Sequence, residues 1–233
     1  MLRAQRATRA LARQAAAHGA TVLQARATPE GGRVRIGDGR VLEADTVVWA
    51  CGPWLGRLFA DVVDIASTCQ ELYFFAGGPD WRAPGVPAFV DFEGAIYGTG
   101  DLDGLGVKAA PDLDGPPLDP EAALPAASAA GEARAREFLR ERFPALAQAR
   151  LAASKCCRYE LSADSHFVAT PHPAHPAVWL YGGGSGHGFK HGPALAEQMA
   201  AALAGKDELP ARFGLGHRIP GRSLRTAGAI ARE

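Results

Sequence analysis

The sequence lacks several features that would assign it to common classes of protein. It carries no net charge, because 25 lysines and arginines balance 25 aspartates and glutamates, so no long-range field draws it to nucleic acid or to an anionic membrane. No apolar run approaches the roughly 20 residues of a membrane-spanning helix, and arginines interrupt the N-terminal segment, where a signal peptide has an apolar core. We therefore expect a cytoplasmic protein whose partners are neither nucleic acids nor membranes.

The four cysteines also lack the spacing of a zinc site. They stand at positions 51, 69, 156 and 157, without a Cys-x-x-Cys pair. A disulfide between the adjacent Cys156 and Cys157 would be strained. We therefore expect free thiols and no bound metal.

What the sequence does contain is a 47% share of hydrophobic residues, enough for a sizeable core. Apolar spacing and glycine or proline stops predict helices at 2–18, 54–59, 131–143 and 193–204. Strands are predicted at 20–24, on either side of the turn 37–39, at 46–50, in four short runs between 72 and 108, and at 157–161, 167–169 and 178–181. The run 46–50 is apolar throughout, which is typical of a strand buried on both faces. The pattern predicts an α/β fold that contains an α+β part with an antiparallel sheet.

The most informative segment is a glycine-rich run between the last predicted strand and the last predicted helix. Five glycines lie between 182 and 188, and Pro193 suits the first turn of a helix. Glycine lets the backbone approach a flat or anionic group, and free amides at a helix start attract negative charge. The run has neither the GxxxxGK[ST] spacing of NTPases nor the GxGxxG and GxSxG spacings of other site turns. It is therefore either a cradle for an anionic cofactor or a flexible connection without a ligand.

Several runs together resemble one family of flavoenzymes. Residues 184–190 read GSGHGFK, and a Cys-x-Tyr run at 157–159 precedes them. With ACGPW at 50–54 and GVK at 106–108, these runs resemble the C-terminal part of the monomeric sarcosine oxidase and N-methyltryptophan oxidase group. That group consists of FAD-dependent amine oxidoreductases related to D-amino-acid oxidase, and the resemblance extends from about residue 5 to residue 225.

The resemblance implies FAD as the cofactor and assigns residues to it. Cys157 would be the thiol joined covalently to the flavin ring, although the adjacent Cys156 leaves the register open by one residue. Lys108 would be catalytic, standing over the flavin to assist its reaction with dioxygen. Further flavin contacts would come from Gly52, Gly184, Ser185, Gly186, His187, Gly188, Phe189 and Lys190. The alternatives are an ordinary buried cysteine at position 157 and a solvated lysine at position 108.

Substrate contacts follow from the same resemblance. Tyr97 and Tyr159 would line the pocket, with membership of the core as the alternative for either. Lys190 would pair with the carboxylate of an amino acid, and His187 would act beside it in catalysis. The implied reaction is FAD-dependent oxidation of a small secondary amine or N-methyl amino acid, with dioxygen as the electron acceptor. A dehydrogenase that passes its electrons elsewhere is the nearest alternative.

The sequence departs from this family in two ways. The N-terminal GxGxxG half of the family has no counterpart in it, and the family's pocket histidine falls near Asp112. We therefore expect a partial, Rossmann-like FAD-binding domain at 1–65 and 151–233, interleaved with a substrate domain at 66–150. The alternative function is a non-catalytic fragment of a truncated or split gene, which needs a partner chain to supply the dinucleotide-binding half.

Overall fold

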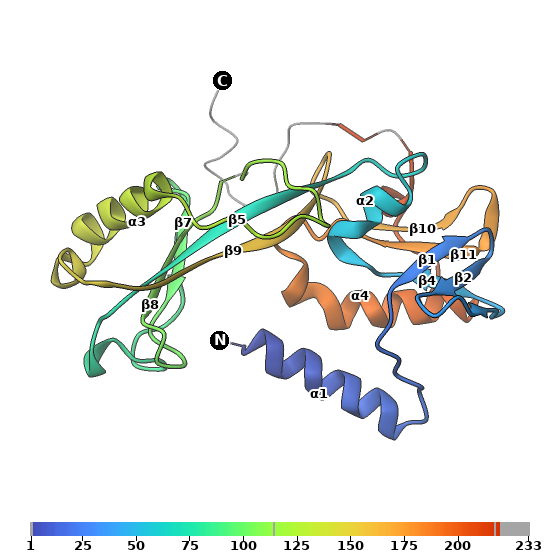
Figure 1. Cartoon of the computed structure of the whole chain (residues 1–233), viewed down its shortest axis with the longest axis horizontal. Coiled ribbons are helices and arrows are strands. Elements are labelled where there is room, and N and C mark those ends of the chain that lie inside the picture. Colours follow the sequence, from blue (N-terminus) through green and yellow to red (C-terminus); the bar gives the residue numbers. More distant parts are fainter. Residues whose placement is uncertain (1, 114, 217, 220–233) are drawn as a thin grey trace.

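Three β-sheets organise the part of the chain that the computed structural model describes, residues 2–113, 115–216, 218 and 219. The largest contains, in spatial order, β6 (Phe89–Asp91), β7 (Ile96–Thr99), β8 (Val107–Pro111), β5 (Ile65–Phe75) and β9 (Leu151–Ser162). The second contains β10 (Val168–His172), β11 (His175–Gly182) and β4 (Val47–Trp49), and the third contains β1 (Ala27–Glu30), β2 (Arg33–Ile36) and β3 (Val41–Leu42). In Figure 1 the long strands β5 and β9 run from the end of the molecule that carries β7 and β8 toward the end that carries the smaller sheets. This arrangement confirms the predicted α/β class with an α+β part.

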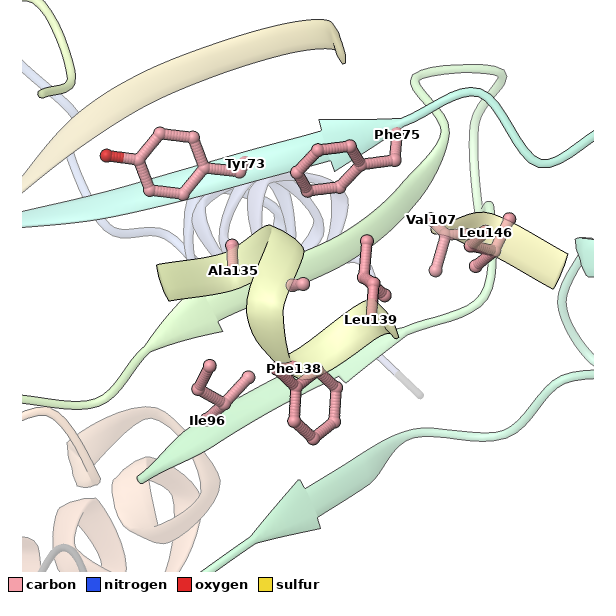
Figure 2. Close-up of a cluster of buried hydrophobic side chains, with 9 residues drawn as sticks. Tyr73, Phe75, Ile96, Val107, Ala135, Phe138, Leu139 and Leu146 are labelled. Atoms are coloured by element: carbon pink, nitrogen blue, oxygen red, sulfur yellow. The ribbon is translucent and has the colours of Figure 1, made fainter. Parts of the chain in front are cut away.

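The five-stranded sheet is antiparallel, as predicted, and a helix covers one of its faces. This helix, α3 (Ala129–Arg142), begins at Ser128, whose hydroxyl accepts the N–H of Gly131 at 3.0 Å. Side chains two apart on a strand share a face, so α3 packs on alternate residues of β5 and β8. Figure 2 shows this cluster, which comprises Tyr73, Phe75, Ile96, Val107, Ala109, Ala135, Phe138, Leu139 and Leu146. The intervening residues of the strands lie on the opposite face.

We expect Leu139→Ala to lower the free energy of unfolding by about 3 kcal/mol, because it leaves a cavity between α3 and the sheet. Leu139 is only 1% exposed within the cluster. Urea denaturation measures the change through the midpoint. The control is Glu141→Ala on the exposed side of the same helix, which should stay within about 0.5 kcal/mol of the parent. Equal stability of the two variants would contradict this account of the packing.

The second sheet joins β4 in parallel to β11, and β11 in antiparallel to β10. Trp49 of β4 is buried in a core with Leu55, Val178 and Leu180. The expectation that β4 is buried on both faces is wrong, because Val48 is 40% exposed. The reason is that the described residues place no covering layer on the face of β4 that carries Val48.

Two helices follow strands of the second sheet, α2 after β4 and α4 after β11. The short helix α2 (Leu55–Leu58) follows β4, close to its predicted position. The helix α4 (Gly188–Leu203) starts five residues before the predicted start at 193, so that prediction is wrong at its N-terminus. Pro193 lies inside α4, where its missing N–H costs one intrahelical bond, that to the carbonyl of Phe189. Short 3-10 helices complete the described part: η1 (Gly52–Trp54), η2 (Pro79–Trp81), η3 (Pro144–Leu146) and η4 (Ala211–Phe213).

The N-terminal helix α1 (Ala4–Ala17) confirms the first predicted helix, but none of its residues is buried. Figure 1 shows it lying apart from the sheets. The strand predicted at 20–24 is wrong: the segment is irregular, and Val22 is 61% and Leu23 53% exposed. A strand needs a neighbour for its N–H and C=O groups, and none of the described sheets includes this segment. Of the helices in the described ranges, none has the length and apolar character needed to cross a bilayer.

Candidate functional site

The face of the five-stranded sheet opposite α3 brings together four of the predicted site residues. The strand register places on it Lys108 of β8, Tyr97 of β7, and Cys157 and Tyr159 of β9. Lys108 Nζ lies 4.1 Å from the centroid of the Tyr97 ring, a cation–π contact. The hydroxyl oxygens of Tyr97 and Tyr159 are 3.3 Å apart, within hydrogen-bonding distance. The two half-buried phenols therefore form one wall beside the lysine.

The two adjacent cysteines of β9 face opposite sides of the sheet. Cys157 is half-buried beside an apolar group on the Lys108 face, formed by Leu72, Phe74 and Ala110. Cys156 is 5% exposed and lies on the α3 side, near Cys69. Burial, followed by the hydrogen bond with Cys69, raises the pKa of Cys156 to about 12. The thiol on the α3 side is thus held in its protonated, unreactive form.

The charge of Lys108 depends on its surroundings. Burial is the main cause that lowers the pKa of Lys108 to about 8, and the positive charge of Lys155 acts in the same direction. Negative charge on Cys157 and Asp112 opposes the decrease. Asp112 stays close to this face, because its N–H donates to the carbonyl of Ala95 at 2.7 Å and continues the pairing of β7 with β8. The lysine is therefore mainly protonated at neutral pH and loses its proton above about pH 8.

Tyr97 is held neutral on the same face. Burial raises its pKa, and the neighbouring Tyr159 raises it further. A neutral phenol can donate one hydrogen bond and accept others. The tyrosine pair can therefore orient a polar group of a substrate without adding charge.

The glycine-rich run is a fixed turn, packed against the end of β9. The N–H of Gly184 donates to Glu160 Oε1 at 3.1 Å, and the N–H of Ser185 donates to the main-chain carbonyl of Glu160 at 2.9 Å. Ser185 is fully buried with φ of 43°, and its Oγ accepts the N–H of Ser162 at 3.2 Å. Gly183 and Gly186 have φ of 71° and 77°, which favour glycine. The run is therefore not a loose connection.

The remaining predicted residues of the run lie at the start of α4. His187 precedes the helix, and its Nε2 lies 2.9 Å from the carbonyl oxygen of Ser165. Lys190 is exposed, with Nζ 3.4 Å from the carbonyl of His187, and Phe189 is also exposed. Gly188 is the first residue of the helix. Free N–H groups of a first turn are donors suited to an anionic ligand.

An open cavity lies where β4 ends. Its volume is about 460 Å³, and its lining residues are Ala25, Arg26, Ala27, Trp49, Cys51, Trp54, Leu58 and Glu121. Gly52 directly follows Cys51 with φ of 58°, and a Cβ there would meet nothing within 4 Å. Ligands of open α/β sheets bind at the carboxyl ends of their parallel strands, which here are β4 and β11. The lining of this cavity includes neither the glycine-rich run nor Cys157, so the three features suit a flavin dinucleotide only as separate contacts.

Sequence reasoning missed the contact between Glu160 and the glycine-rich run. It follows the Cys-x-Tyr run within β9, and one of its carboxylate oxygens is buried. The sequence contained one signal. Glu160 is an acidic residue near the end of a predicted strand, and the backbone N–H groups of the glycine-rich run could bind its carboxylate. A buried carboxylate requires such donors.

A family model described as FAD dependent oxidoreductase (DAO) matches residues 1–202. Among curated proteins, the monomeric sarcosine oxidase of Bacillus sp. (strain NS-129) is 35% identical over 127 residues, covering 52% of this chain and 33% of the relative. The monomeric sarcosine oxidase of Streptomyces avermitilis is 32% identical over 178 residues, covering 72% of this chain and 46% of the relative. The chain thus spans less than half the length of these curated relatives.

Solved structures of two oxidoreductases from Aspergillus species share the fold. Amadoriase I, the fructosyl amine:oxygen oxidoreductase of Aspergillus fumigatus, superposes with a TM-score of 0.68 at 24% identity, covering 81% of this chain and 47% of that chain. A modified fructosyl peptide oxidase from Aspergillus nidulans gives a TM-score of 0.70 at 20% identity, covering 84% of this chain and 51% of that chain. At these identities the likeness concerns the fold alone.

Proposed function

The chain belongs to the FAD dependent oxidoreductase family. We propose that it contains the substrate-binding part of an amine oxidase, together with part of the FAD-binding domain. The substrate would be a secondary amine or N-methyl amino acid, and dioxygen would accept the electrons. The observation that supports this most directly is the grouping of Lys108, Cys157 and the two tyrosines on one sheet face. Part of the proposal is a division into an FAD-binding part (1–65 and 151–233) and a substrate part (66–150). Residues 220–233 of the first part lie outside the described residues.

FAD, when bound, supplies the two-electron acceptor for oxidation of the amine. We propose that the chain holds it at Gly52, along the fixed turn formed by Gly184, Ser185 and Gly186, and through the first turn of α4 with Gly188 and Phe189. Cys157 would form the covalent link, because this thiol lies on the Lys108 face. The donors of the first helical turn suit the negatively charged cofactor.

Each polar group on the sheet face would have a separate task. The Lys108 ammonium would stabilise negative charge that builds on oxygen. Tyr97 and Tyr159 would orient the amine and, as aromatic rings, exclude water from it. Lys190 and His187 would bind the carboxylate of an amino-acid substrate at the start of α4.

A second candidate function is a non-catalytic chain that requires a dinucleotide-binding half from elsewhere. Exposed apolar surface favours it: Val22 and Leu23 are unpaired, Val48 of the edge strand β4 is 40% exposed, and α1 buries no residue. We propose that a dinucleotide-binding half pairs with β4 and covers α1. The partner would then supply the contacts to the pyrophosphate of FAD.

We expect this chain, expressed by itself, to retain little FAD through gel filtration, because no GxGxxG turn is present in its sequence. Co-expression with the N-terminal half of the Streptomyces relative should give one flavin per complex, measured by visible absorbance. Val48→Asp should abolish this gain, since it places a charge on the face that the partner covers. Phe92→Asp is the matched control, because Phe92 is 50% exposed and directly follows β6, a strand of a different sheet. Stoichiometric flavin in the chain alone would refute the second candidate.

A further inference from the structure

The carboxylate of Glu160 accepts a hydrogen bond from the glycine-rich run. Its Oε1 accepts the N–H of Gly184 at 3.1 Å, and its main-chain carbonyl accepts the next N–H, that of Ser185, at 2.9 Å. Glu160 is thus bonded to two consecutive residues that lie more than twenty positions later in the chain. Glu160 and Ser162 of β9 therefore both hold the run in place, Glu160 through two main-chain N–H groups and Ser162 through the Ser185 hydroxyl.

Two of the glycines leave room for the Glu160 carboxylate, and Gly182 leaves room for Leu55 as well. A Cβ on Gly182 would lie 2.8 Å from Glu160 Oε2, and a Cβ on Gly184 would lie 3.2 Å from Oε1. Both distances are shorter than ordinary van der Waals contact. The absence of a side chain at these positions therefore leaves space for the Glu160 carboxylate. This is a reason for glycine that does not depend on a ligand.

Of the two carboxylate oxygens of Glu160, Oε2 is the one that accepts no hydrogen bond from the described residues. This oxygen is buried. The charge acts on neighbouring groups at the ends of both parallel strands. Burial is the main cause that raises the pKa of the Cys51 thiol to about 11 and that raises the pKa of Tyr181. The negative charge of Glu160 raises both further. The carboxyl ends of β4 and β11 thus lie in a negative field.

We propose, on the basis of the proposed function, that Glu160 is a positioning residue that fixes the glycine turn and lowers the reduction potential of the FAD bound there. The N–H groups of Gly184 and Ser185 already donate to Glu160, so the turn would contact the cofactor through its other atoms. Reduction adds negative charge to the flavin, and an unpaired carboxylate nearby disfavours that charge. The N–H groups of the first turn of α4 act in the opposite direction. The reduction potential therefore depends on the opposing effects of the Glu160 charge and the N–H groups at the start of α4.

The charge is tested with Glu160→Gln in the FAD-loaded complex of this chain with the dinucleotide-binding half. Glutamine keeps an acceptor for Gly184 but removes the charge. Equilibration with a redox dye of known potential should show about a tenfold increase in the equilibrium constant for reduction, which corresponds to about 30 mV for a two-electron couple. Glu141→Gln, on the exposed side of α3, is the matched control and should leave the constant unchanged. An unchanged constant in Glu160→Gln, or a decrease, overturns the proposal.

The positioning role is tested without flavin, by amide hydrogen exchange of the free chain. Glu160→Ala should speed exchange at Gly184 at least tenfold, whereas Glu160→Gln should change it little. Equal protection in Glu160→Ala and the parent overturns the proposal. If Glu160→Ala does not fold, the dye measurement on Glu160→Gln decides. A parent complex that binds no FAD refutes the proposed function instead, and the exchange result then decides whether Glu160 fixes the turn.

Discussion

Replacing Lys108 with Met is expected to slow the reaction of the reduced enzyme with dioxygen about 100-fold, while anaerobic reduction by substrate changes far less. Only the oxygen step builds negative charge on oxygen, and a half-buried ammonium above the Tyr97 ring is placed to stabilise it. Loss of about 3 kcal/mol of such stabilisation corresponds to two orders of magnitude in rate. Methionine keeps most of the volume and removes the charge. Stopped-flow absorbance of the flavin times the two half-reactions separately.

The same variant should change the pH dependence of the oxygen step. Because the pKa of Lys108 is lowered to about 8, the cation is present below that pH and is lost above it. The rate with the parent enzyme should therefore fall as the pH rises through about 8, and the rate with Lys108→Met should lack this fall.

The matched control for Lys108 is Lys155→Met. Lys155 is exposed on the same face, with Nζ 5.5 Å from the centroid of the Phe74 ring, and its charge lowers the pKa of Lys108. Its replacement should leave the oxygen step fast at neutral pH and move the fall in rate to higher pH. Equal slowing of both half-reactions by Lys108→Met would indicate a packing role. An unchanged oxygen rate would mean that the electrons leave by another acceptor.

The sequence predicted the elements of the five-stranded sheet because each short strand carries a local signal. Short β-type runs such as 72–75 and 106–108 are separated by glycine, proline and aspartate. The first lies within β5, and β8 begins within the second. The register between strands has no such local signal, because it depends on pairing between residues far apart in the chain. The pairing of Gln70 with Cys157 places this thiol, and not Cys156, on the Lys108 face. The sequence left that alternative open.

The errors in the predicted elements arise where local propensity and tertiary contacts disagree. Propensity at 20–24 favours a strand, but no described neighbour pairs with that segment. The apolar run of β4 implies burial on both faces, but burial requires a covering layer that the described residues do not provide for Val48. The start of α4 was placed at Pro193, because proline favours a first turn. The helix instead tolerates it and begins at Gly188.

Glu160 could not be identified from the sequence because its role arises from tertiary contact. Nothing within β9 indicates that its carboxylate accepts an N–H from a turn that follows β11. From the sequence, the glycines that face it indicate either a cradle for a cofactor or a flexible connection, since glycine in a sequence does not show what approaches it. The structure adds a second reason for the glycine at 182 and at 184.

Flavin in the loaded complex is expected to remain with the protein after acid precipitation, and Cys157→Ser should release all of it. The half-buried Cys157 lies on the face that carries Lys108 and the tyrosine pair. A thiol must be accessible and able to ionise to form a covalent bond. Cys157 meets the first condition, because its side chain is only half-buried. Absorbance of the washed precipitate, redissolved in denaturant, measures the attached flavin.

Cys156→Ser is the matched control, since it changes the adjacent thiol on the opposite face. Cys156 lies on the α3 side of the sheet, and its pKa is raised to about 12, chiefly by burial and by Cys69. The variant should therefore keep its flavin in the precipitate. Release by Cys156→Ser with retention by Cys157→Ser would mean that the strand register of β9 is shifted by one residue in the protein. Release from the parent complex itself would mean that FAD is held by the glycine turn and the helix start without a covalent bond.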